Sequence, residues 1–220
     1  MLVRTRRGDT IIEVTIAILV SCVITVISIS LMNSGIKTTE NSLELIMARN
    51  SMNAQAEALR FLHSAYLTEL RSGNTSGKFG NIWKAAISKT NGRHIRINTT
   101  CDEAYGENGY GIDGGFVINT RKINEVSGSI LLSDTNDNQR KFRPSSLYSR
   151  IVFGNDSHMN SLTSTNSNMV RAEGIWVTTA KDPNSKFYDF YIQSCWFGVG
   201  SDVPSTLVTV IRLYNPEIGG

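Results

Sequence analysis

The sequence predicts an α+β protein in which one long N-terminal helix packs on an antiparallel β-sheet. Three observations support this fold class: an apolar run at residues 11–32, a helical pattern that continues to residue 70, and a series of β-rich segments after it. A chain of 220 residues is long enough for one domain with a core and an appendage. With 40% hydrophobic and 19% charged residues, the composition is that of a folded protein.

The apolar run has the length and the flanking charges of a membrane-spanning helix. Its 22 residues include one charge, Glu13, and a helix of this length spans about 33 Å, enough for a bilayer core. Arg4, Arg6 and Arg7 precede the run, and Lys37 is the first basic residue after it. This bias predicts a cytoplasmic N terminus and an extracellular remainder. The run is too long for an ordinary secretory leader, and a plain signal anchor leaves Glu13 unexplained.

The charge distribution gives no indication of nucleic-acid binding. The formal net charge is +3, and without residues 1–8 the Lys+Arg count falls from 22 to 19, equal to the 19 Asp+Glu. The rest of the chain is therefore formally neutral, and no basic surface for nucleic acid is predicted.

An amphipathic helix is predicted to follow the apolar run, at residues 37–71. Apolar residues at steps of three and four predict one buried stripe. The stripe consists of Leu43, Met47, Ala54, Ala58, Phe61 and Ala65. The polar side consists of Arg49, Asn53, Glu57, Arg60 and Ser64. Gly73 and its polar neighbours then predict the end of the helix.

A β-rich head is predicted at residues 72–220, after a turn and a short helix at residues 79–87. Segments rich in Val, Ile, Tyr, Phe and Trp, several with period-two alternation, predict strands. They lie at 114–119, 129–132, 147–153, 169–178, 187–197 and 207–214, with a further strand at 94–98. No helical segment intervenes, so the sheet is predicted to be antiparallel. Asp182-Pro183 and Val203-Pro204 predict hairpin connections, and the Ser/Asn-rich stretch 155–168 an exposed loop.

The cysteines leave two alternatives open. Cys22 lies in the apolar run, whereas Cys101 and Cys195 lie in the head. Outside the cell, Cys101 and Cys195 are candidates for one disulfide. The alternative is a pair of buried free thiols.

No catalytic or metal-binding motif stands out in the head. His63, His94 and His158 have no spacing that makes a metal site, and no nucleophile, zinc-protease or phosphate-loop motif occurs. The acidic stretch 134–138 lacks the glycine and the closing glutamate of a calcium loop. Trp83, Trp176 and Trp196 are predicted to be core residues. We therefore expect no enzyme activity, no metal and no cofactor.

The residues Arg6-Arg7-Gly8-Asp9 and Glu13 resemble the processing site of type IV prepilins and secretion pseudopilins. The resemblance implies that a prepilin peptidase cuts after Gly8 and that Asp9 becomes the first residue of the mature chain. It also implies that Glu13, then the fifth residue, neutralises the new α-amino group of a neighbouring subunit during filament assembly. Two features depart from the family: Asp9 stands where most members have Phe, and the apolar run contains no proline.

The resemblance implies a pilin-like organisation of the whole chain. Residues 1–8 are then the leader, 9–36 the transmembrane and assembly helix, 37–71 the amphipathic helix, and 72–220 the extracellular head. The expected function is that of a structural subunit, a minor pilin of a type IV pilus, which moves from the cell membrane to the surface filament. Its expected partners are the membrane, the peptidase and other pilin subunits. A secretion pseudopilin, a membrane-anchored surface binding protein and an anchored enzyme are the alternatives, and the ligand of the head is left open.

Overall fold

The chain folds into two compact units that share one helix, α1. The structure is a computed structural model, and it divides the chain into an N-terminal unit, Met1–Leu43, and a C-terminal unit, Glu44–Gly220. The described residues are 9–74, 77–88, 115–120, 131–133, 142–143, 145, 147–153, 170–181, 185–199 and 201–215. The elements are α1 (Asp9–Arg71), α2 (Lys78–Ser88), β1 (Phe116–Ile118), β2 (Leu131–Ser133), β3 (Phe142–Arg143), β4 (Arg150–Phe153), β5 (Val170–Glu173), β6 (Ile175–Ala180), β7 (Phe187–Phe197) and β8 (Pro204–Tyr214).

The helix α1 confirms the predicted unbroken helical run. It has 63 residues and covers the whole predicted range 11–70. In the N-terminal unit every described side chain from residue 11 to residue 43 is exposed. Of the described helices, α1 is the one long and apolar enough to cross a membrane, and none of its most apolar stretch is buried. The C-terminal unit begins at Glu44, within the segment 37–71 that the sequence predicts to be amphipathic.

The predicted apolar stripe of α1 was wrong for three of its large members. Leu43, Met47 and Phe61 are 53%, 39% and 44% exposed. The buried side of α1 is rotated by about one residue, roughly 100° around the helix. The buried residues of α1 are Glu44, Ala48, Met52, Gln55, Ala56, Ala58, Leu59, Leu62 and Tyr66. Ala58 of the predicted stripe is thus buried as expected, whereas Ala54 is exposed. The sequence favoured the other stripe because Glu44 and Gln55 interrupt this one with polar groups. The predicted polar side is exposed, as expected.

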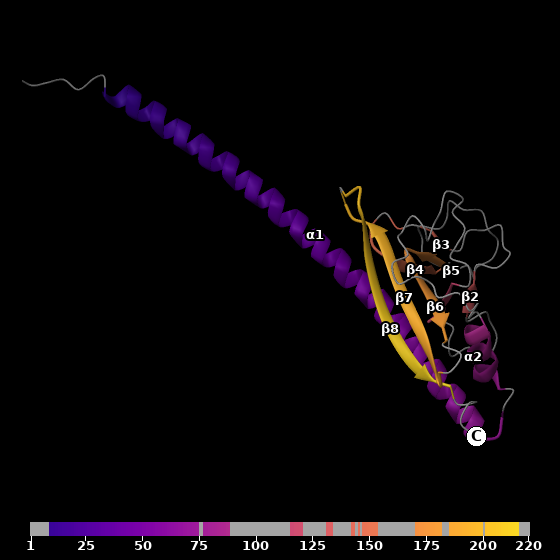
Figure 1. Ribbon diagram of the computed structural model, residues 1–220. Coiled ribbons are helices and arrows are strands. Elements are labelled where there is room, and N and C mark those ends of the chain that lie inside the picture. Colours follow the sequence, from indigo (N-terminus) through magenta and orange to yellow (C-terminus); the bar gives the residue numbers. More distant parts are fainter. Residues whose placement is uncertain are drawn as a thin grey trace, which may run out of the picture. The chain divides into compact units, whose positions relative to one another are not determined.

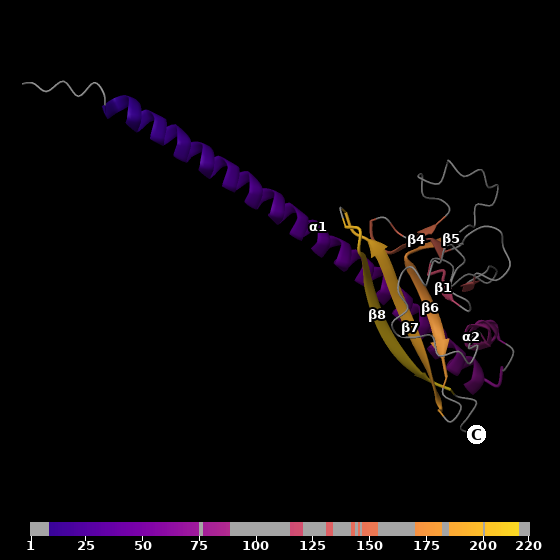
Figure 2. The same cartoon turned by 45° about the horizontal axis from the view of Figure 1, so that its top comes forward.

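Two sheets make up the rest of the C-terminal unit. The larger has five strands in the order β2-β1-β6-β7-β8, and all its pairings are antiparallel, as predicted. The smaller has the order β3-β5-β4, and its β3–β5 pairing is parallel, which was not predicted. Figures 1 and 2 show the C-terminal part of α1 running across one face of the larger sheet, next to β7 and β8. The bounds of β7 match the prediction, and α2 confirms the predicted short helix.

The segment predicted as one strand at 169–178 forms two strands that belong to different sheets. Gly174, with φ of +68°, separates β5 from β6. This left-handed conformation is open to glycine and strained for other residues. The Gly174 carbonyl accepts a hydrogen bond of 2.7 Å from the Cys195 amide, so the bend is locked to β7. A Cβ at Gly174 would overlap the Cys195 carbonyl oxygen.

An aromatic cluster around Trp83 forms the centre of the core. The Trp83 side chain of α2 is fully buried. Its ring centroid lies 4.9 Å from that of His63 and 6.1 Å from that of Tyr66, both on α1. It also lies 6.2 Å from Tyr188 and 5.6 Å from Phe190, both on β7. Trp83 therefore joins both helices to the sheet.

A cross-strand ion pair ties β7 to β8 on the side of the sheet opposite the helices. Asp189 and Arg212 are direct partners in the register. The Arg212 guanidinium donates two hydrogen bonds to the Asp189 carboxylate, at 2.7 and 2.8 Å. These bonds, helped by the charge of Arg212, hold the pKa of Asp189 below its ordinary value of 3.8, against the opposing effect of burial.

We expect the pair to make the stability of the C-terminal unit pH-dependent in acid. Because the folded pKa of Asp189 is depressed, its contribution is fully present above the unfolded pKa and is lost as the pH falls through the folded pKa. The free energy of unfolding of wild type should exceed that of Asp189→Asn by a small, constant amount above about pH 5, and the difference should shrink as the pH falls below the ordinary pKa of 3.8. Urea unfolding of both proteins across this range checks it. A difference that stays constant down to pH 2 would contradict the assignment.

Candidate functional site

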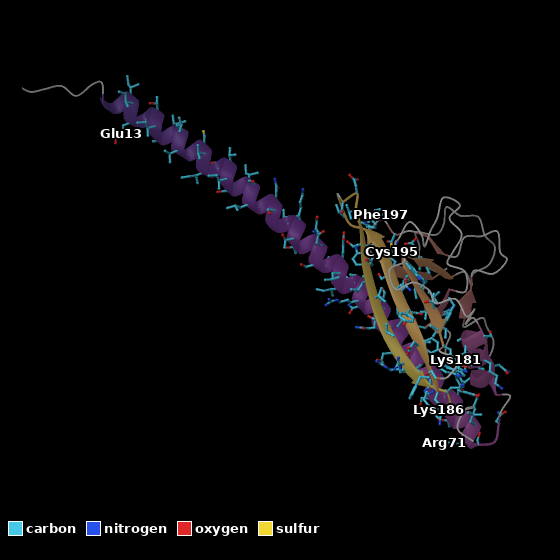
Figure 3. All side chains as sticks on the ribbon, in the orientation of Figure 1. Glu13, Arg71, Lys181, Lys186, Cys195 and Phe197 are labelled. Carbon is cyan, nitrogen blue, oxygen red and sulfur yellow. The ribbon has the colours of Figure 1, made fainter. Side chains whose placement is uncertain are left out.

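The residues with the processing-site pattern lie at the start of α1. Gly8 lies outside the described residues, and Asp9 is the first residue of α1. Glu13 follows on the first turns of the helix, with its side chain exposed (Figure 3). Its neighbours Ile12 and Val14 are 62% and 57% exposed apolar residues. Glu13 is therefore a carboxylate on the surface of an otherwise apolar helix.

No group within the N-terminal part of α1 can neutralise Glu13. The sequence from residue 9 to residue 36 contains no lysine or arginine. Among the described residues, none forms an ion pair or hydrogen bond with the Glu13 side chain. A carboxylate costs about 2.5–3.5 kcal/mol at the centre of a bilayer and less near its edge, and such groups usually have a partner. The side chains of residues 9–36 therefore offer Glu13 no counter-charge.

Three hydroxyl side chains of this segment bond to the backbone of the helix. The hydroxyls of Thr15, Thr25 and Ser28 donate to backbone carbonyls three or four residues earlier, at 2.8–2.9 Å. Such bonds let hydroxyl groups enter an apolar environment at low cost. Glu13 has no equivalent bond among the described residues, so its polar group, unlike these hydroxyls, is not satisfied by the helix.

Three further polar side chains of α1 bind the C-terminal unit together. Glu44 is buried, and its carboxylate accepts hydrogen bonds of 3.2 Å from the Trp196 indole and from the Val199 amide. These contacts fix the start of the helix in this unit to the end of β7. Both donors are neutral, so the contact is a set of charge-assisted hydrogen bonds.

Gln55 pairs with the backbone of Ile118 in β1, as a residue of a neighbouring strand would. Its side-chain amide is fully buried, donates to the Ile118 carbonyl at 2.9 Å and accepts from the Ile118 amide at 2.7 Å. Both backbone groups of Ile118 are thus paired to a helix side chain, as they would be in a ladder. This pair of bonds allows a polar residue on the buried side of α1.

Glu69, which lies on α1, caps the N-terminus of α2. Its carboxylate accepts from the backbone amides of Phe79 and Gly80 at 3.1 and 2.7 Å. The first amides of a helix have no partner within it, and they favour an anion. A Cβ at Gly77 would overlap this carboxylate, so glycine leaves room for the cap.

Sequence reasoning missed Glu44, Gln55 and Glu69. Their positions are at steps of three and four from the buried apolar residues, on the series 44, 48, 52, 55, 59, 62, 66 and 69. This periodicity was the available signal. The polar residues hid this periodicity, because a polar side chain is normally predicted to be exposed when no hydrogen-bond partner is known for it.

The cysteine and histidine predictions are partly covered by the described residues. Cys195 on β7 is buried and disulfide-bonded, whereas Cys22 is free. Cys101 lies outside the described residues, so its pairing with Cys195 stays a prediction. His63 lies at the edge of the core, with Nε2 2.8 Å from the Tyr214 carbonyl oxygen, to which it donates. His94 and His158, like the acidic stretch 134–138, lie outside the described residues.

The described part of the C-terminal unit contains no metal-ligand cluster. Within it, no three His, Cys, Asp or Glu side chains come together as they would around a metal ion. The three tryptophans are buried core residues, as predicted, with Trp83, Trp176 and Trp196 at most 3% exposed. No family model, curated protein or solved structure matches the chain significantly.

Proposed function

We propose that the chain is a structural subunit of a type IV pilin-like filament, a minor pilin that is processed after Gly8 and assembled through α1. The single observation that carries the proposal is the Glu13 carboxylate, which has no partner among the described residues and lies five residues after Gly8, on the apolar first part of α1. Cleavage after Gly8 creates an α-amino group on Asp9. In an apolar environment this amine of one subunit is the cation that Glu13 of its neighbour lacks.

The amine and the carboxylate set the register between subunits. Two exposed apolar helices can slide along each other at little cost, because dispersion contacts do not depend strongly on register. A charge pair in low dielectric is favourable only when the two groups are close. Glu13 would thus select one axial offset between neighbouring helices, and Asp9 places a second carboxylate beside the amine.

The C-terminal unit supplies a rigid body attached to the assembly helix. Glu44, Gln55 and Glu69 bond α1 to β7, to β1 and to α2. The same helix that carries the apolar segment is thereby part of the core of this unit. Such a chain can hold its folded unit on a filament without a separate linker.

Processing is the direct test of the proposal. Co-expression of the full chain with a prepilin peptidase should shorten it by eight residues and leave Asp9 as the N-terminal residue, read by mass spectrometry. Gly8→Ala should abolish the cleavage. Gly35→Ala is the matched control, since a Cβ there meets no atom within 4 Å, and it should be cleaved normally. A wild-type chain that stays uncut beside an active peptidase would refute the proposal.

Glu13→Ala separates an assembly subunit from a simple membrane anchor. The processed variant should remain in the membrane but fail to enter filaments, because the amine of its neighbour loses its counter-charge. Glu40→Ala, an exposed glutamate on the same helix, is the matched control and should assemble like wild type. Equal amounts of Glu13→Ala and Glu40→Ala in sheared filaments would favour the anchored surface protein.

A further inference from the structure

Among the described residues, the backbone groups on the outer edge of β8 have no partner along most of the strand. β8 is the last strand of the five-stranded sheet, and no described strand pairs with its outer edge. Its ladder with β7 runs without a bulge over eleven residue pairs, from Pro204 opposite Phe197 to Tyr214 opposite Phe187. A long regular edge of this kind is a template for another strand.

Along β8, residues bonded to β7 alternate with residues whose backbone groups point outward. This alternation, the hydrogen-bond parity of the strand, shows which residues face the free edge. The Asn215 amide donates to the Lys186 carbonyl at 2.7 Å, and these two residues continue the β7–β8 register. Hydrogen-bonded pairs alternate in an antiparallel ladder, so the odd-numbered residues of β8 bond to β7. The even-numbered residues, from Thr206 to Tyr214, point their amides and carbonyls outward. His63 of α1 reaches the Tyr214 carbonyl, consistent with this parity, and it closes that end of the edge.

The devices that normally protect an edge are missing from residues 205–211. This stretch contains no charged residue and no proline, although edge strands are commonly blunted by lysine, proline or bulges. Val208 and Val210 are 38% and 51% exposed on the face opposite the helices. The one charged residue of β8, Arg212, is bonded to Asp189 of its own sheet.

The sequence of the edge is complementary to itself. Leu207-Val208-Thr209-Val210-Ile211 reads as the same pattern in both directions, with β-branched or leucine side chains placed symmetrically about Thr209. When two such strands pair antiparallel with Thr209 opposite Thr209, Val208 lies opposite Val210 of the other copy, and Leu207 lies opposite Ile211. The even-numbered residues then face each other as hydrogen-bonded pairs, which is the parity that the free groups require. Like charges stay apart, because Arg212 lies opposite Thr206.

We propose that β8 pairs antiparallel with β8 of a second copy of this chain, about a two-fold axis at Thr209. The contact joins two five-stranded sheets into one and satisfies the outward amides and carbonyls from Thr206 to Arg212. It is an isologous contact, in which the same surface serves both partners. It is separate from the apolar segment of α1 and does not depend on cleavage after Gly8.

Cysteine cross-linking of the full chain in mild detergent tests the axis. In a Cys22→Ser background, Thr209→Cys should form a reducible dimer on oxidation with copper phenanthroline. The two Thr209 residues would be a non-hydrogen-bonded pair, with Cα atoms about 4.5 Å apart. Ser205→Cys is the matched control: it is also exposed and on β8, but its two copies would lie about 27 Å apart. The dimer band from Thr209→Cys should exceed that from Ser205→Cys at least tenfold.

Blocking the edge should remove the cross-link. Val210→Pro in the Thr209→Cys protein deletes an outward amide and leaves the β7 ladder intact, so the dimer should fall at least fivefold, whereas Val210→Thr should keep it. Val208→Lys, a change at an exposed side chain, serves as the second blocking variant if the proline hinders folding. A dimer band no stronger for Thr209→Cys than for Ser205→Cys overturns the proposal. A dimer band that neither Val210→Pro nor Val208→Lys weakens also overturns the proposal.

Discussion

Replacement of Gly174 by alanine is expected to lower the free energy of unfolding of the C-terminal unit by about 3 kcal/mol or more. Two costs add at this position. An L-residue is strained at a φ of +68°, and its Cβ would overlap the Cys195 carbonyl oxygen. The overlapping atom belongs to the backbone of a central strand, which cannot move without breaking ladder bonds. Urea unfolding of the full chain in mild detergent, followed by tryptophan fluorescence, measures the loss.

Gly73 provides the matched control for this prediction. It also has a positive φ, of +79°, at the end of α1, but a Cβ there meets nothing within 4 Å. Gly73→Ala introduces only the strain of an L-residue at positive φ, so the expected loss of unfolding free energy is about 1–2 kcal/mol. Equal losses for the two variants would show that the close approach to β7 contributes nothing.

Truncation of Trp83 to alanine should cost about 3–5 kcal/mol. The side chain is fully buried between both helices and β7, so its removal leaves a cavity that rigid neighbours cannot fill. Trp83→Phe should cost much less, because it keeps an aromatic ring in the cluster. The indole Nε1–H has no acceptor among the described residues, so phenylalanine gives up no hydrogen bond known there. The same unfolding experiment checks both variants through Trp176 and Trp196.

Phe61 provides the control for aromatic truncation, since it also lies between α1 and α2. It packs edge-to-face on Phe79 at 5.8 Å, yet it is 44% exposed. Phe61→Ala should cost only about 1 kcal/mol. If Phe61→Ala and Trp83→Ala were equally damaging, the core would not be centred on α2 as described.

Local patterns predicted the elements well and their partners less well. The length of α1, the position of α2 and the bounds of β7 follow from periodicity and turn residues close in sequence. The break at Gly174 was missed because a glycine between two β-rich segments reads the same in a continuous strand. The parallel β3–β5 pairing could not be predicted, since it joins short segments through contacts distant in sequence.

The buried side of α1 shows why the remainder could not be predicted. A helix stripe with Glu44 and Gln55 is acceptable only if backbone donors and acceptors of distant strands meet it. Those donors come from Trp196, Val199 and Ile118, more than sixty residues away. For the candidate site, the sequence placed Glu13 on its helix, whereas the role of Gly8 is a matter of processing and stays a prediction.

The carboxylate of Glu69 has a practical consequence for labelling the molecule. The start of α2 is held from α1, so the short connection between the two helices need not itself define where α2 begins. Extra residues inserted at the exposed Gly73 lengthen this connection, and lengthening a loop costs little entropy. An epitope or fluorophore tag inserted there would leave both helices seated and would mark the protein without touching α1, β8 or the core.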